Sequence, residues 1–287
     1  MTTSSLDNAQ STTSSTGHAL AEANWLDIHF EVARVEYEAM LRDVGLQPGW
    51  HVLDAGCGGG SFLPLMSELV GPAGKITALD LAPENVAIVE QRAAANHFCC
   101  AVQAQQGSVT QLPFADNSLD AVWCANVVQY LTKAEFHQMA AEFFRVLHPG
   151  GILAIKEFDQ TAMQLGPLDP EVIWHWNQAR RKYEQFLGGN HTLNFRKWLG
   201  EAGFTIGSHK TYIGEDQHPL SEKQRRLLRG ALRLFAGFAE KLPDLSPAEK
   251  EIWRQRIADI DNPDHIIHEP DFYFRRAYVL IRTNVPE

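Results

Sequence analysis

The stretch that decides the fold is Val52-Leu-Asp-Ala-Gly-Cys-Gly-Gly-Gly60, an apolar run that ends in an acid and continues into glycines. Glycine has no Cβ, so the backbone can turn sharply after a strand and place its N–H groups close to a ligand. The spacing is Asp54-x-Gly56-x-Gly58-x-Gly60, whereas a dinucleotide motif would need a glycine where this chain has a serine. The stretch therefore predicts a strand, a ligand-binding turn and a helix, and favours a ligand other than a dinucleotide.

A second apolar run closed by an acid lies at Lys75-Ile-Thr-Ala-Leu-Asp80-Leu-Ala-Pro83. It is typical of a buried strand followed by a helix that begins at proline. Asp80 follows the glycines by about 20 residues, the interval at which an acid accepts hydrogen bonds from ribose in nucleotide sites. An ionised carboxylate can accept from both ribose hydroxyls at once, so Asp80 is a candidate ribose ligand.

These two segments resemble the class I S-adenosylmethionine-dependent methyltransferases of the small-molecule type, whose first motif is an acid followed by alternating glycines after the first strand. Two further segments agree with this resemblance: the stretch Gln106–Val122 and the turn Leu147-His-Pro-Gly-Gly151. The resemblance implies S-adenosyl-L-methionine as the cofactor. The cofactor-binding residues that it implies are Asp54, Gly56, Gly58, Gly60, Asp80, Leu81, Ser108, Val109 and Asn126.

The same resemblance implies a methyl-transfer pocket. Ser108 stands where the family often has an aspartate for the adenine amino group, and a serine hydroxyl is a weaker acceptor. We expect no metal, because the sulfonium methyl is already activated. A general base is needed only if the acceptor atom carries a proton, and Glu157 and His191 are the first candidates for that catalytic role. The expected substrate-pocket residues are Trp25, His29, Gln129, Tyr130 and Trp174.

Strand and helix patterns alternate along the chain with short connections. This alternation predicts an α/β, Rossmann-like, seven-stranded and mostly parallel sheet with helices on both faces. Ligands of such sheets bind at the carboxyl ends of the strands. Six of the strands are expected at 51–55, 75–81, 101–107, 119–125, 152–158 and 272–283, and the sixth in chain order is expected after Gly203-Phe204. The helices are expected at 19–44, 62–70, 83–96, 133–147, 171–187 and 195–202.

The expected domain boundaries follow from where the alternation of strands and helices begins and where it becomes irregular. Two largely helical stretches between residues 221 and 260 exceed the short connection that a family core would need before its last strand. We expect a disordered tail at 1–17, an N-terminal helical lid at 18–48 and a cofactor-binding core at 49–215. A helical cap for substrate, inserted between the sixth and seventh strands, is expected at 216–271, and the last core strand and C-terminus at 272–287.

Composition narrows the function classes. A chain of 287 residues that is 45% hydrophobic can bury one large core. Its formal charge of −10 argues against a nucleic-acid partner, because such binding depends on lysine and arginine contacts. Four cysteines without metal or disulfide spacing predict a reducing, cytoplasmic location, and no apolar run suits stable membrane insertion. Homo-oligomerisation is left open.

The sequence thus predicts a methyltransferase of the secondary-metabolism type, in which SN2 transfer carries a methyl group to C, O or N of a small, partly apolar or aromatic metabolite. Aromatic residues of the second half, such as Trp174 and Phe235, motivate the apolar substrate. Three alternatives stay open. The chain could bind the cofactor for a cyclisation or for sensing, it could methylate a macromolecule, or it could be a nicotinamide oxidoreductase, which the glycine spacing and Asp54 oppose.

Overall fold

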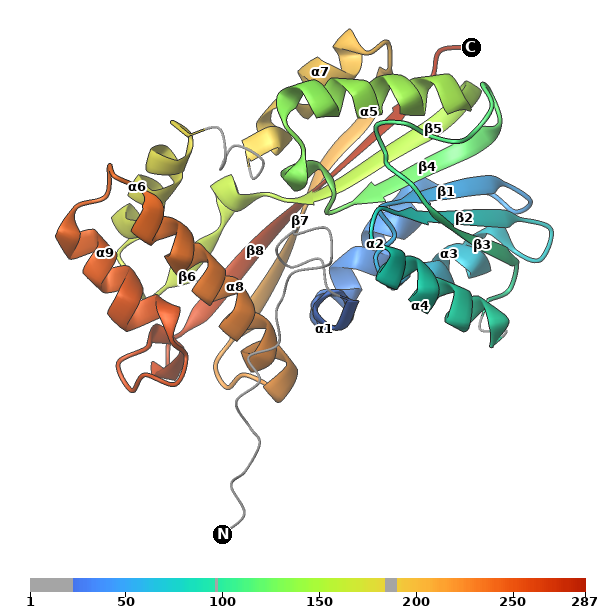
Figure 1. The fold of residues 1–287 in the computed structure, drawn as a ribbon. Coiled ribbons are helices and arrows are strands. Elements are labelled where there is room, and N and C mark those ends of the chain that lie inside the picture. Colours follow the sequence, from blue (N-terminus) through green and yellow to red (C-terminus); the bar gives the residue numbers. More distant parts are fainter. Residues whose placement is uncertain (1–22, 96–97, 184–189) are drawn as a thin grey trace.

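The computed structural model describes residues 23–95, 98–183 and 190–287 (Figure 1). The tail expected at 1–17 lies outside the described residues. The helices are α1 (Ala23–Val32), α2 (Arg34–Val44), α3 (Leu63–Val70), α4 (Pro83–Ala94), α5 (Lys133–Val146), α6 (Pro170–Arg180), α7 (Phe195–Glu201), α8 (Glu222–Lys241) and α9 (Pro247–Trp253). The strands are β1 (His51–Ala55), β2 (Lys75–Asp80), β3 (Ala101–Gln106), β4 (Leu119–Ala125), β5 (Leu147–Phe158), β6 (Gln164–Gly166), β7 (Thr205–Gln217) and β8 (Tyr273–Asn284).

The strands form one sheet in the order β3-β2-β1-β4-β5-β8-β6, and β7 also pairs with β8. Strands β1 to β5 are parallel, whereas β8 runs antiparallel to β5, β6 and β7. The predicted Rossmann-like, mostly parallel fold is therefore confirmed. The described sheet has eight strands instead of seven, because the short segment Gln164–Gly166 pairs with the first residues of β8. Three residues are too few to show a strand period in sequence.

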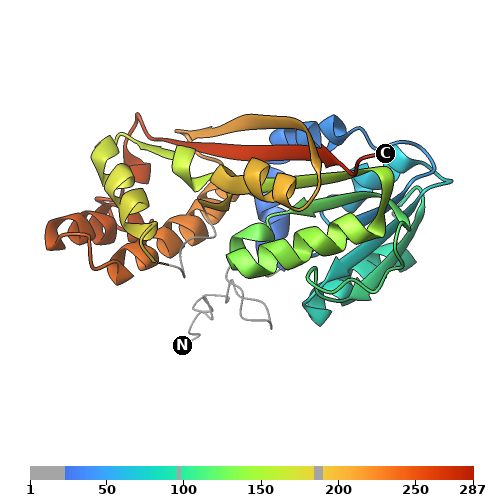
Figure 2. The ribbon, with the colours of Figure 1, turned by 90° about the horizontal axis from the view of Figure 1, so that it is seen from above.

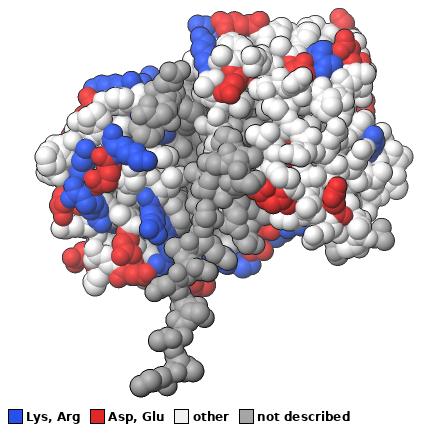
Figure 3. Space-filling view, viewed as in Figure 1, with Lys and Arg blue, Asp and Glu red and all other residues white. Residues whose placement is uncertain are grey.

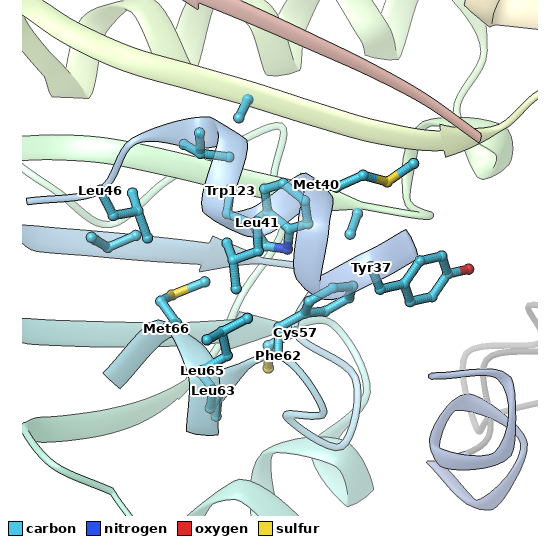
Figure 4. Packing of buried hydrophobic residues seen from close by; sticks show 14 of the residues in the cluster. Tyr37, Met40, Leu41, Leu46, Cys57, Phe62, Leu63, Leu65, Met66 and Trp123 are labelled. Atoms are coloured by element: carbon cyan, nitrogen blue, oxygen red, sulfur yellow. The ribbon is translucent and has the colours of Figure 1, made fainter. Parts of the chain in front are cut away.

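Helices cover both faces of the sheet. Buried residues of α2, α3 and α4 pack on one face, and those of α5 and α7 pack on the other. On the first face the ring of Phe62 lies 5.6 Å from that of Tyr37 and 5.2 Å from that of Trp123, measured between centroids (Figure 4). This burial on both sides explains why the parallel strands β1, β2, β4 and β5 read as apolar runs, whereas β3, at the edge of the sheet, is only partly buried and carries three glutamines.

The expected N-terminal helix at 19–44 is two helices where the structure describes it. Ala33 leaves the helical conformation at φ −100° and ψ 18°, although its N–H still bonds to the carbonyl of His29 at 3.1 Å. Ala33 is fully buried, so the break lies against the core. The apolar spacing of the sequence contains no stop at this point, because the bend comes from packing. Helix α1 is thereby directed toward α8 (Figure 1).

Helices α8 and α9 lie between β7 and β8, as predicted for a cap between the last two long strands, and Figure 2 shows them at the opposite end of the sheet from α3 and α4. Capping boxes at Ser221 and Ser246 begin them. With α6 they enclose a separate apolar cluster that contains Trp176, Phe235 and Trp253. No helix among the described residues is long and apolar enough to cross a membrane.

Candidate functional site

A cleft lies at the carboxyl ends of β1, β2, β3 and β4, where α1 and α2 cover it. Its empty volume is about 1040 Å³, which includes space open to solvent. The structure brings ten of the residues singled out from sequence into its lining: His29, Asp54, Gly56, Gly58, Asp80, Leu81, Ser108, Val109, Asn126 and Tyr130.

The glycine turn after β1 forms the floor of this cleft. Gly56 has φ +76°, and a Cβ added there would lie 2.2 Å from a methyl carbon of Val127. A Cβ at Gly58, with φ +53°, would lie 2.5 Å from the side chain of Leu26. Gly60 is not among the lining residues; its Cβ would meet Leu63 at 2.6 Å, so this glycine allows the turn into α3. Any side chain at these positions would displace a neighbour.

Asp80, at the end of β2, holds the glycine turn in place. Its Oδ2 accepts a hydrogen bond of 2.8 Å from the N–H of Gly58. Its Oδ1 accepts from the N–H of Ala82 at 2.9 Å and from the side-chain amide of Asn85 at 3.2 Å. A carboxylate has about four acceptor positions, so Asp80 keeps capacity for a ligand hydroxyl.

Asp54, at the end of β1, is a carboxyl group that lacks a partner. It is 1% exposed, and no donor among the described residues lies within hydrogen-bond distance of its Oδ2. Burial, followed by the charge of Asp80, raises the pKa of Asp54 to about 8. A buried carboxyl of this kind is stabilised by a cationic ligand, and the ammonium group of S-adenosylmethionine would supply one.

The far side of the cleft suits an adenine ring. Leu81 is 47% exposed and lies beside Asp80, and Val109 lines the same wall. The hydroxyl of Ser108 lies 2.8 Å from that of Thr110 and accepts from the Thr110 N–H at 3.2 Å. This hydroxyl is thus engaged within its own turn.

Comparison with known proteins agrees with this geometry. Residues 52–151 match the family described as "Methyltransferase domain". A demethylmenaquinone methyltransferase of Staphylococcus aureus is 31% identical over 140 residues, which are 47% of this chain and 54% of that protein. An uncharacterised 37.1 kDa protein of a Streptomyces fradiae transposon is 33% identical over 142 residues, 50% of this chain and 40% of that protein. The chain thus spans about half the length of the curated relatives it matches.

Solved structures share the fold. The BH2331 protein of Bacillus halodurans has a TM-score of 0.56 at 18% identity, covering 87% of this chain and 98% of that one. The YcgJ protein of Bacillus subtilis has the same TM-score at 17% identity, covering 87% and 97%. Residues 52–151 of the chain therefore carry the methyltransferase domain of this family. The cofactor of this family is S-adenosyl-L-methionine, and the cleft residues described above fit it.

Helix α1 is tied to the glycine turn through Asp27. One carboxylate oxygen accepts from the hydroxyl of Ser61 at 2.7 Å, and the other accepts from Arg92 at 2.8 Å. Arg92 also donates to the carbonyl of Gly59 at 2.5 Å. These three groups hold α1, which carries Leu26 and other lining residues, against the floor of the cleft.

We expect Asp27→Asn to speed the release of S-adenosylhomocysteine by about two- to fivefold, because half-exposed ion pairs of this kind contribute modestly. Stopped-flow displacement from the full-length protein measures this rate. Asp116→Asn, which removes an exposed partner of Arg145 far from the lid, is the matched control and should leave the rate unchanged. An Asp27→Asn rate equal to the wild-type rate would contradict a role of this contact in cofactor retention.

The two candidate bases lie outside the lining of the cleft. Glu157 is buried at the end of β5 and accepts a 2.6 Å hydrogen bond from the N–H of Val128, and its burial raises its pKa to about 7. In this position it holds the segment after β4. His191 is buried with its ring centroid 5.2 Å from that of Trp198, and burial lowers its pKa to about 4. The described structure therefore places neither the Glu157 carboxyl nor the His191 imidazole in the lining of the cleft.

Three expected pocket residues also lie outside the lining. Trp25 is buried at the contact of α1 with α8, where a Cβ on Gly230 would lie 2.3 Å from its ring. Gln129 donates to the carbonyl of Asn126 at 3.1 Å. Trp174, which is 57% exposed on α6, borders a separate cavity beside β6. The contacts of Trp25 and Gln129 thus support lining residues from behind.

Sequence reasoning missed Lys156, which lies in the layer behind Asn126. This lysine is fully buried in β5, and its Nζ donates to Asn126 Oδ1 at 2.6 Å. Its signal was a lysine inside the apolar run 152–158, since lysine is almost never fully buried without a reason. Several apolar lining residues, Leu26, Phe30 and Phe62 among them, were also missed.

Proposed function

We propose that this protein is an S-adenosylmethionine-dependent methyltransferase whose acceptor is a small, partly apolar molecule. The observation that carries the proposal is the unpartnered, buried carboxyl of Asp54 above a glycine turn with no room for side chains. Beside this polar end, α1 and the residue that precedes α3 contribute apolar side chains to the same cleft, namely Leu26, Phe30 and Phe62. A polar anchor facing an apolar wall is typical of small-molecule sites.

Different residues of the cleft would bind different parts of the cofactor and the acceptor. The bound cofactor supplies the electrophilic methyl group. Asp54 would hold its ammonium group, Asp80 its ribose hydroxyls, and Leu81 with Val109 its adenine. Phe30 and the lid helix exclude water and hold the acceptor in line with the methyl group.

Two observations favour a small acceptor over a macromolecule. Acidic and basic side chains are interspersed on the face shown in Figure 3, whereas a nucleic-acid surface needs a continuous basic patch. The matching Staphylococcus aureus relative is named for a small molecule, demethylmenaquinone. The aromatic residues of the cap do not support the proposal, because Trp176 and Phe235 are buried in the apolar cluster of the cap.

Two measurements on the full-length protein test this function. Calorimetric titration with S-adenosylhomocysteine should show saturable binding, and NAD should show none. Mass spectrometry of a small-metabolite panel incubated with methyl-labelled S-adenosylmethionine should then find a labelled product. Methylation of protein or RNA alone would refute the small acceptor. Tight binding without any S-adenosylhomocysteine formed on turnover would instead favour a cyclisation or a sensing role.

A further inference from the structure

A buried lysine lies behind one wall of the proposed active site. Lys156 Nζ is 3.7 Å from the centroid of the Tyr37 ring and 4.5 Å from that of Tyr278. Its hydrogen bond goes to Asn126, and the carboxyl of the adjacent Glu157 acts on it through its charge without forming an ion pair among the described residues. Burial lowers the pKa of Lys156. Burial outweighs the opposing charge of Glu157 here, so the ammonium form of Lys156 is costly, and an anion bound nearby would stabilise that form.

This lysine determines what Asn126 and Tyr37 present to the cleft, which both of them line. Lysine can only donate, so the amide oxygen of Asn126 faces Nζ and its NH₂ group is turned away from it. Asn126 has φ +60°, a conformation that a residue other than glycine keeps only when its surroundings require it. The amide also hydrogen-bonds the hydroxyl of Tyr37, which lies 3.1 Å from Nε2 of His29. The NH₂ group of Asn126 and the hydroxyl of Tyr37 therefore gather at this wall, and this hydroxyl also has Tyr278 as a hydrogen-bond partner.

The acidic groups of the cleft and the pair of Asn126 and Lys156 come from different strands of the sheet. Asp54 and Asp80 come from β1 and β2, whereas Asn126 and Lys156 come from the ends of β4 and β5. The acids suit the cationic cofactor. The donors and the buried cation suit an electron-rich oxygen, whereas an amine acceptor would develop positive charge beside the lysine.

We propose that the acceptor reacts through an ionised oxygen of the phenol or enol type, which Asn126 and Tyr37 receive and Lys156 stabilises from behind. This inference rests on the proposed methyltransferase function and names its substrate class. Lys156 is a positioning residue, because it acts through Asn126 and the ring of Tyr37.

The reaction balances without a further reagent. The acceptor hydroxyl loses its proton to solvent when it binds as the oxyanion. A lone pair of that oxygen forms the new O–CH₃ bond while the S–CH₃ bond breaks, and the bonding pair returns to sulfur. The products are a neutral methyl ether and the neutral thioether S-adenosylhomocysteine, so the transfer cancels the charges of the sulfonium and the oxyanion.

A matched acceptor series tests the proposal with the full-length protein and labelled S-adenosylmethionine. The probes are phenols, including 4-nitrophenol, and anilines with the same ring substituents. We expect kcat/KM for phenols to exceed that for anilines at least tenfold. Lys156→Met should lower kcat/KM for phenols at least tenfold, whereas Lys210→Met, which changes an exposed lysine paired with Asp43, should not.

Two further measurements keep the proposal separate from folding and from the cofactor site. Tyr37→Phe preserves the ring beneath Lys156 and removes one hydroxyl, so it should fold and lower kcat/KM for phenols about fivefold. The affinity of Lys156→Met for S-adenosylhomocysteine should stay within threefold of wild type. Preference for anilines, no transfer to any phenol, or phenol kinetics unchanged by both variants would overturn the acceptor class. Retained S-adenosylhomocysteine binding in those cases would leave the methyltransferase proposal standing.

Discussion

Replacing Asp54 with asparagine should weaken S-adenosylhomocysteine binding about a hundredfold at pH 8 and much less at pH 6. The pKa of this carboxyl is raised to about 8 by burial and by Asp80, so in the free protein it is largely protonated at pH 6. It must ionise to pair with the ammonium group of the ligand, and binding then releases a proton. Wild-type affinity should therefore rise by up to about tenfold per pH unit between pH 6 and pH 8.

Calorimetry in two buffers of different ionisation enthalpy measures both the affinity and the released proton. Asp244→Asn, which removes an exposed carboxylate paired with Lys182, is the control and should retain the wild-type pH profile. The asparagine variant at position 54 should show a flat profile, because it cannot ionise. A wild-type dissociation constant that is equal at pH 6 and pH 8 would remove Asp54 from the ammonium site.

Gly56→Ala should destabilise the protein by about 2–4 kcal/mol and weaken S-adenosylhomocysteine binding about a hundredfold. Two causes act together. Alanine is strained at φ +76°, and its Cβ would lie 2.2 Å from the Val127 methyl carbon. Because Val127 follows Asn126, the collision moves the loop after β4 that forms the opposite side of the cleft.

Gly150→Ala separates these causes. Gly150 has φ +80°, but a Cβ there would have nothing within 4 Å, so only the backbone strain of about 1–2 kcal/mol remains. Chemical denaturation and calorimetry on both variants provide the comparison. Equal losses of stability in the two, with cofactor binding intact in Gly56→Ala, would show that the turn does not need to approach a ligand closely.

The cofactor half of the site could be predicted because its chemistry is local in sequence. Each of its acids lies at the end of an apolar strand, and parallel strands bring their carboxyl ends to the same edge of the sheet. Asp54, Asp80, Ser108 and Asn126 therefore line one cleft although they are far apart in the chain. The acceptor half could not be predicted in this way, because its residues come from a helix, a strand interior and the last strand.

Glu157 and Lys156 show why the acceptor half could not be predicted from the sequence. Neighbouring residues of a strand point to opposite faces, so one of them supports the segment after β4 while the other lies behind Asn126. Their order in the chain does not reveal which face carries the cleft. Aromatic residues have the same ambiguity, since Trp176 is core and Trp174 is exposed on the same helix.

By itself the amino-acid sequence determined the α/β alternation, the glycine turn and the two acids of the cofactor site, because strand period, turn chemistry and short connections act between neighbouring residues. Only the tertiary structure decided the bend at Ala33 that brings α1 over the cleft, and the burial of Lys156 between Tyr37 and Tyr278. Both depend on contacts between segments more than a hundred residues apart in the chain. Packing, and not local propensity, determines such contacts.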